Sequence, residues 1–327
     1  MILKGLHHVS SITADAAKNY HFYTKVLGLR LVKKSVNQDD ISVYHLYYGD
    51  EIGNPGTVMT FFEIPMAGRN HEGVNSISAV SFRVPDDEAL HFWKERFERL
   101  NVQHEGIRER AGRLTLAFRD GEGHRMILVS DENNRGVQGG RPWERSVVPR
   151  QYAIRGLGPA KLTVADGEKT AAVLTELLGF RKKGEYPSDG PGGSRIQVFE
   201  TGEGGTGAEV HVEERKDLPR ERLGRGGVHH VAFRVENEEE LHEWVNILRE
   251  RNIPNSGFVD RFYFRSLYFR EPNGILFELA TDGPGFANDE EFEHLGESLA
   301  LPPFLEPMRE RIESVLKPLD TVWKEDE

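Results

Sequence analysis

The sequence predicts an α+β fold built from four βαβββ modules in two tandem halves. Two observations predict this fold. The chain repeats itself at one fixed offset, and within each half the hydrophobic pattern passes twice from a strand to a helix and back to strands. Curved mixed sheets built from such modules are expected to form cup-like barrels with the helices outside.

The internal repeat relates two long parts of the chain. Residues 5–34 resemble residues 156–183, and the matched positions, such as Gly5 and Gly156, lie 151 residues apart. The segment 80–93 resembles 231–244 at the same offset. One offset that holds over roughly 100 residues indicates a duplication. A stretch rich in glycine and proline near residue 140 is typical of a linker between the halves.

The repeat gives the expected domain boundaries. We expect an N-terminal domain over 1–145, a C-terminal domain over 152–283, and a tail over 284–327 that packs on the domains. The four modules are predicted at 5–64, 76–131, 154–215 and 225–281.

The fourth module shows the pattern of its elements most clearly. Residues 230–235 alternate between apolar and other side chains, as a strand with one buried face does. A helix is predicted over 237–251, because Asn237 can cap its first turn and acidic residues follow it. Strands punctuated by glycine and proline are predicted at 258–260, 265–271 and 274–281.

Composition excludes several classes of protein. The 327 residues carry 42 Lys and Arg against 53 Asp and Glu, so the net charge is −11, which argues against nucleic-acid partners and against anionic membranes. No apolar run is long enough to span a bilayer, and no signal peptide is evident, so a cytoplasmic protein is expected. The chain has no cysteine, which leaves histidine and carboxylate as the ligands for any metal.

Two histidine doublets break the repeat. His7-His8 begins the first strand of module one, and His229-His230 begins that of module four, whereas the matching strands of modules three and two have no histidine. Glu278 lies in the last strand of module four, where module two has an isoleucine. A difference between duplicated modules indicates a function that only some of them keep.

Side-chain alternation sharpens this hypothesis. His230 and Glu278 lie out of phase with the apolar residues beside them, so both should point to the concave side of the sheet. With His8 they form a 2-His-1-carboxylate set, which is the ligand set of non-heme Fe(II) oxygenases. The alternative is that these are ordinary structural histidines. His7 and His229 should face the other side unless a bulge intervenes, where they would either pack or support the ligands.

The sequence resembles the vicinal-oxygen-chelate superfamily of glyoxalases, bleomycin resistance proteins and extradiol dioxygenases. Within it, the chain most closely resembles the hydroquinone-type ring-cleaving dioxygenases. The motifs are LHHV at 6–9, YHLYYGDE at 44–51 and VHHVAF at 228–233, and the resemblance covers nearly the whole chain. It implies two glyoxalase-like domains. His45, within the second motif, is a candidate cavity residue.

The resemblance implies roles for particular residues. The metal ligands would be His8, His230 and Glu278. Arg261 and Tyr268 would lie near the substrate, although a salt bridge and a packed strand aromatic are the plain alternatives. His7 and His229 match positions that surround the ligands.

Two departures from related subfamilies narrow the resemblance. Catechol-cleaving relatives take their first histidine from module three, where this chain has Gly158-Pro159. Modules one and four must therefore share one metal-bearing cup. Glyoxalase I has a second carboxylate ligand at the position of Thr60, and Glu63 should face the other side of its strand, so three ligands are favoured.

The sequence thus predicts an Fe(II)-dependent dioxygenase that uses O2 to cleave methyl- or chloro-substituted hydroquinones. Fe(II) is the expected cofactor, although other divalent metals suit these ligands. A small aromatic compound is the expected partner, and a homo-oligomer is compatible with the sequence. The alternatives are a metal-dependent isomerase or lyase of the same fold, and a resistance protein that binds an aromatic compound.

Overall fold

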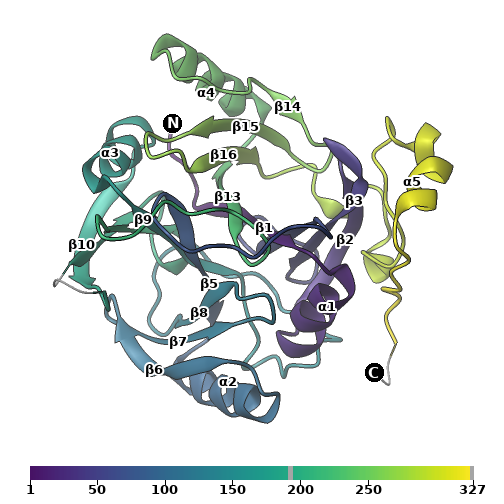
Figure 1. The fold of residues 1–327 in the computed structure, drawn as a ribbon, viewed down its shortest axis with the longest axis horizontal. Helices are drawn as coiled ribbons and strands as arrows, with labels where there is room; N and C mark the ends of the chain where they lie inside the picture. The colour runs from purple at the N-terminus through teal and green to yellow at the C-terminus, as the bar shows by residue number, and fades with distance from the viewer. Residues whose placement is uncertain (191–193, 325–327) are drawn as a thin grey trace.

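Two curved mixed sheets of eight strands each dominate the computed structural model, which describes residues 1–190 and 194–324 (Figure 1). Residues 191–193 of module three and 325–327 of the tail lie outside the described residues. The first sheet has the strand order β14-β15-β16-β13-β1-β4-β3-β2, and the second β10-β11-β12-β9-β5-β8-β7-β6. The predicted α+β fold of four βαβββ modules is confirmed.

Each module contributes one helix and four strands to this plan. The strands are β1 (Leu6–Thr13), β2 (Arg30–Asn37), β3 (Asp40–Gly49), β4 (Val58–Glu63), β5 (Ser76–Val84), β6 (His104–Arg110), β7 (Arg113–Arg119), β8 (Arg125–Ser130), β9 (Leu157–Val164), β10 (Arg181–Pro187), β11 (Arg195–Glu200), β12 (Glu209–Glu214), β13 (Val228–Val235), β14 (Val259–Asp260), β15 (Arg265–Arg270) and β16 (Leu276–Thr281). The helices are α1 (Ala16–His21), α2 (Asp87–Arg99), α3 (Gly167–Ala172), α4 (Glu238–Glu250) and α5 (Arg309–Val315). The repeat extends to irregular turns, because α1 and α3 each continue into a π-helical turn, Phe22–Val26 and Val173–Leu177.

The modules pair across the two halves of the chain. Modules one and four build the first sheet, joined by the antiparallel pair β1 and β13. Modules two and three build the second sheet, joined by β5 and β9. Each sheet therefore takes one module from each half, and the domain boundaries at 1–145 and 152–283 stay a prediction.

Helix α4 illustrates how the sequence sets an element. The side chain of Asn237 accepts a hydrogen bond from the backbone N–H of Glu240, which caps the first turn. Leu241, Trp244 and Leu248 recur at helical spacing and are buried against the first sheet. The prediction of 237–251 thus differs from the observed Glu238–Glu250 only at the two capping positions.

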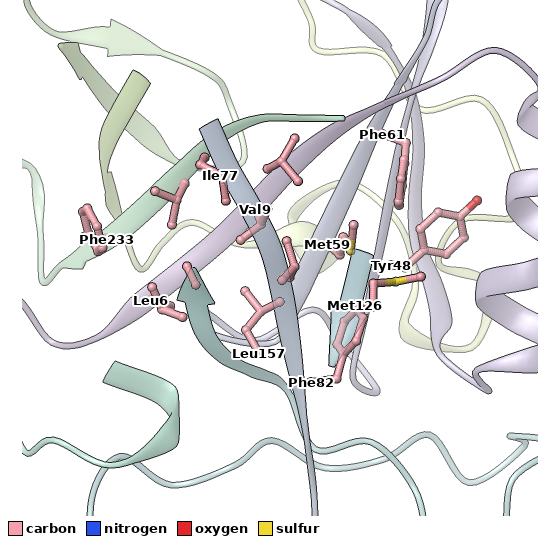
Figure 2. Close-up of a cluster of buried hydrophobic side chains, with 14 of the residues drawn as sticks. Leu6, Val9, Tyr48, Met59, Phe61, Ile77, Phe82, Met126, Leu157 and Phe233 are labelled. Carbon is pink, nitrogen blue, oxygen red and sulfur yellow. The ribbon is translucent and has the colours of Figure 1, made fainter. Parts of the chain in front are cut away.

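The largest hydrophobic cluster draws side chains from both sheets. Figure 2 shows Val9, Met59 and Phe61 of the first sheet beside Ile77 and Phe82 of the second. Burial of such side chains contributes roughly 1.5–3 kcal/mol each, so this cluster is a main source of stability for the fold. Because one face of each sheet packs in this apolar cluster, polar side chains are left to the opposite faces.

The C-terminal tail runs along the outside of the first sheet, beside β2 and β3 (Figure 1). The backbone N–H of Ala300 donates to the carbonyl of Lys34, and the Tyr44 hydroxyl donates to the carbonyl of Lys317. Ile312 of α5 is buried in the main cluster. None of the described helices is long and apolar enough to cross a membrane.

Candidate metal centre

Three side chains from three neighbouring strands converge at the centre of the first sheet. His8 lies on β1, His230 on β13 and Glu278 on β16, and all three are buried. The Nε2 atoms of the two histidines are 3.3 Å apart. Glu278 Oε2 lies 3.1 Å from His8 Nε2 and 2.9 Å from His230 Nε2. The structure thus brings together the three predicted ligands.

This triangle has the dimensions that a divalent cation requires. Ligand atoms about 2.1 Å from one cation are about 3 Å apart when they bind at right angles to one another. Glu278 Oε2 is buried and accepts no hydrogen bond, whereas Oε1 accepts one from the Ser266 hydroxyl at 2.6 Å. A buried carboxylate oxygen without a hydrogen-bond donor needs another positive partner. The residues therefore fit a metal ion, although their role as ligands stays a prediction.

The electrostatic surroundings of the triad favour the binding of a cation. Burial alone would raise the pKa of Glu278, but His8 and His230 beside it hold that pKa well below its usual range. Burial lowers the pKa of His230 and so favours its neutral form, against the opposing effect of Glu278. Metal binding requires a carboxylate and neutral imidazoles, so this electrostatic arrangement favours it.

His7 fixes which nitrogen of His8 faces the site. His7 Nε2 lies 3.0 Å from the carbonyl oxygen of Thr281, which can only accept, so Nε2 carries the hydrogen. Burial lowers the pKa of His7 to about 3, so the ring is neutral and its Nδ1 must accept. The donor to it is His8 Nδ1–H at 2.8 Å, which leaves the lone pair of His8 on Nε2 toward the site.

A bulge at each doublet explains this arrangement. The register between β1 and β13 shifts between Leu6 and His8, and again between Ser10 and Ser11 opposite the second doublet. His229 therefore lines the same cavity as His230, and their Nδ1 atoms are 2.8 Å apart. Burial is also the main reason why the pKa of His229 falls to about 4. A bulge, which the sequence allowed but did not decide, is present at both doublets.

A cavity of about 300 Å³ is lined by the two histidines of the triad, His8 and His230. Its walls include Phe62, Phe264, Ile12 and Leu276. Apolar and aromatic walls with a few polar groups are typical of a site for a small aromatic molecule.

Arg261 and Tyr268 lie together on the wall of this cavity. Tyr268 pairs with Glu278 across β15 and β16, and its hydroxyl lies 3.2 Å from Arg261 Nε. Burial and the neighbouring carboxylate of Glu278 raise the pKa of Tyr268, so the phenol keeps its proton. Arg261 also donates to the Asp39 carboxylate on the β2–β3 turn at 3.0 Å. Both predicted residues face the site, and the salt bridge foreseen as an alternative for Arg261 is present too.

The positions expected for a fourth ligand are not available for that role. The Thr60 hydroxyl lies 2.7 Å from that of Ser10. Glu63 Oε1 accepts a hydrogen bond from the backbone N–H of Ala16 at the start of α1, away from the triad. Three protein ligands leave open positions at a metal ion.

Sequence reasoning missed part of the cavity wall. Ser10 and Tyr47 line the cavity, and His45 lies between Tyr47 and Thr60 in one hydrogen-bonded chain. Alternation from His8 would have placed Ser10 on the concave face. The contact of His45 and Thr60 depends on the register of β3 and β4, which the sequence does not reveal.

Comparison with known proteins assigns the chain to a family. Residues 5–128 and 156–279 match the model of the Glyoxalase/Bleomycin resistance protein/Dioxygenase superfamily. The chain belongs to this superfamily, as the vicinal-oxygen-chelate resemblance predicts.

Particular relatives cover nearly the whole chain. "Putative ring-cleaving dioxygenase MhqA" of Bacillus subtilis (strain 168) is 56% identical over 98% of this chain and 100% of its own length. "Chlorohydroquinone/hydroquinone 1,2-dioxygenase" of Sphingobium indicum is 31% identical over 95% of both chains. A solved structure of a "putative dioxygenase" from Bacillus subtilis superposes with a TM-score of 0.87 at 35% identity, covering 98% of each chain.

Proposed function

We propose that this protein is an Fe(II)-dependent, extradiol-type dioxygenase that uses O2 to cleave the ring of methyl- or chloro-substituted hydroquinones. The observation that carries the proposal is the buried His8, His230 and Glu278 triangle, whose two histidines line a cavity with aromatic walls. Three protein ligands would leave coordination positions of a bound metal open for a substrate oxygen and for O2. The printed names of the relatives, ring-cleaving dioxygenases and a hydroquinone 1,2-dioxygenase, support the same reaction.

The residues around the triad have distinct tasks in this proposal. Bound Fe(II) would supply the one-electron chemistry that allows O2 to react with an aromatic ring. Tyr268, protonated and beside Glu278, can donate a hydrogen bond to a substrate oxygen. Arg261 can stabilise negative charge that develops as the ring opens.

The histidines that precede the ligands have supporting tasks. His7 orients His8 through the Nδ1 contact, and His229 does the same for His230 from within the cavity wall. His229 lines the cavity and is neutral, and because its Nδ1 accepts from His230, its Nε2–H is left to donate a hydrogen bond there. The apolar walls limit the access of water to the reacting ring.

The wider features of the protein belong to the same proposal. We assign the catalytic cup to modules one and four within domains 1–145 and 152–283, in a cytoplasmic enzyme with a small aromatic substrate. A homo-oligomer is compatible with this arrangement.

Oxygen uptake after anaerobic loading with Fe(II) tests the proposal. Methylhydroquinone and chlorohydroquinone should give rapid uptake together with a new ring-opened chromophore, and catechol should react more slowly. Preference for catechol would contradict the substrate class. No uptake with any of the three by protein containing one metal ion per chain would favour the isomerase, lyase or binding-protein alternatives.

A further inference from the structure

A chain of hydrogen bonds runs along the cavity wall from β1 across β4 to β3, on the other side of β13 and β16 from Tyr268 on β15. The Tyr47 hydroxyl lies 2.7 Å from His45 Nδ1, and His45 Nε2 lies 2.8 Å from the Thr60 hydroxyl. The Thr60 hydroxyl lies 2.7 Å from that of Ser10. We call these four side chains the hydroxyl–imidazole relay. Both its ends and His45 line the cavity, whereas Thr60 is fully buried behind them.

Counting hydrogens shows what the relay offers to a ligand. Burial lowers the pKa of His45 well below its usual range, so its ring is neutral and carries one N–H. Three hydroxyl groups and one N–H supply four hydrogens, and three hydrogen bonds use three of them. Because a neutral imidazole donates from one nitrogen and accepts at the other, the free hydrogen lies at one end of the relay. It is on Ser10 or on Tyr47, and both ends face the cavity.

The register of the sheet places the two ends at different distances from the metal centre. Ser10 pairs with His230 across β1 and β13, so this end adjoins the triad. Thr60 pairs with Ser10, and Tyr47 pairs with Thr60, so the other end lies two strands further away. Neighbouring strands are about 4.8 Å apart, which puts about 10 Å of cavity wall between the backbones of Ser10 and Tyr47.

We propose that the Tyr47 end of the relay binds the second hydroxyl group of a para-diol and thereby selects hydroquinones over compounds that lack this group. The inference rests on the proposed function, because it takes the first hydroxyl group to lie at the triad. A hydroquinone has its oxygens at opposite ends of the ring, so only one can approach the metal while the other reaches across the cavity. The two oxygens of a catechol are neighbours, and neither reaches the Tyr47 end.

The relay suits an oxygen that changes its protonation. When the free hydrogen is on Tyr47, this end donates to the far oxygen of the substrate. When all three hydrogen bonds reverse, the free hydrogen is on Ser10, and Tyr47 accepts from the substrate hydroxyl. Tyr47 is held for this task by its ring contacts with Phe286 and Tyr263, at centroid distances of 5.0 and 6.5 Å.

Binding of hydroquinone and phenol to anaerobic, Fe(II)-loaded protein tests the proposal without turnover. Wild-type protein should bind hydroquinone more tightly than phenol, which lacks the far hydroxyl group. Tyr47→Phe should reduce this preference about fivefold to tenfold, the typical effect of one lost hydrogen bond. Thr60→Val interrupts the relay behind the cavity wall with little change in side-chain shape, and should reduce the preference about threefold.

Tyr48→Phe is the matched control. Tyr48 follows Tyr47 on β3, faces the hydrophobic core, and its buried hydroxyl has no hydrogen-bond partner. This variant should keep the wild-type preference. The proposal is overturned if the wild type shows no preference, if Tyr47→Phe and Thr60→Val keep it, or if Tyr48→Phe reduces it equally.

Oxygen uptake separates this proposal from the proposed function. If the wild type consumes O2 with hydroquinone but the relay variants keep the binding preference, the binding role of the relay is wrong and the proposed function stands. If the relay variants lose the preference but no diol supports oxygen uptake, the binding role stands and the function is wrong.

Discussion

The two sheets follow the same plan, yet their concave faces differ. We call the face of the first sheet that carries the triad the open cup, and the matching face of the second sheet the filled cup. At the offset of the repeat, His8 corresponds to Pro159 and Glu278 to Ile127. Among the described residues, the group able to hold a metal lies in the open cup.

Ion pairs occupy the filled cup instead. His211 pairs with Lys161 across β12 and β9, just as Thr60 pairs with Ser10 in the open cup. The filled cup contains Glu209, held by two hydrogen bonds of 2.8 Å from Arg113 and lying 3.1 Å from His211 Nε2. Beside them, Lys161 lies 2.7 Å from Glu213.

The difference lies in how each cup satisfies its buried carboxylate. Burial alone would raise the pKa of Glu209, but Arg113 and His211 hold that pKa below its usual range. Protein cations thus provide the positive charge in the filled cup. In the open cup the ring nitrogens of His8 and His230 lie beside Glu278 Oε2, and a cation bound among these three atoms would take the place that Arg113 has in the filled cup.

Removal of the carboxylate from the open cup should have the largest effect. We expect Glu278→Gln to weaken metal binding at least about a hundredfold, because the neutral amide loses the charge that attracts a divalent cation. Oxygen uptake should fall with the metal content. Metal analysis after dialysis checks this outcome, and stoichiometric metal with full turnover in the variant would contradict the assignment.

The matching substitution in the filled cup should affect stability instead. Glu209→Gln leaves Arg113 without its charged partner in a largely buried place, so the free energy of unfolding should fall by about 2–4 kcal/mol. Metal content should stay at the wild-type level. Denaturant unfolding and metal analysis of the same preparations check both parts. Loss of metal from this variant would show that the two cups are not independent.

The smallest effect on stability is expected where the segment between β4 and β5 contacts the segment between β12 and β13. Asn70 and Glu221 occupy matching positions of the repeat, and the Asn70 amide donates to the Glu221 carboxylate at 3.0 Å. Burial raises the pKa of Glu221 to about 7 from its ordinary value of 4.5, against the opposing effects of Asn70 and Arg125. The folded protein therefore binds this proton more tightly than the unfolded chain does.

The sign of the pH dependence follows from this raised pKa. The contribution to stability is present below about pH 4.5 and is lost as the pH rises through 7. Glu221→Gln should be about 1–2 kcal/mol more stable than the wild type at pH 8 and nearly equal to it at pH 4. Unfolding curves at the two pH values check this, and an equal difference at both would exclude Glu221 as the cause.

Some features of the site could be predicted because they are local or repeated. The duplication made the His doublets and Glu278 visible as departures, and strand alternation gave the side on which His230 and Glu278 lie. The modules followed from hydrophobic period and from caps such as Asn237.

Other features depend on long-range pairing that no local pattern encodes. The tautomer of His8 depends on His7 and on the carbonyl of Thr281, which is far away in the sequence. The relay depends on the register of β1, β4 and β3. Each bulge could be named as an alternative but not decided, because a one-residue shift in pairing reverses which face a side chain occupies.

The measurement that tests the central claim most directly is the fate of oxygen in the product. Fe(II)-loaded protein would react with methylhydroquinone under ¹⁸O₂, and mass spectrometry would follow the ring-opened compound. The account predicts one O2 consumed per substrate and two labelled oxygen atoms in the product. Formation of a quinone with unlabelled oxygens and hydrogen peroxide would identify an oxidase and contradict the account.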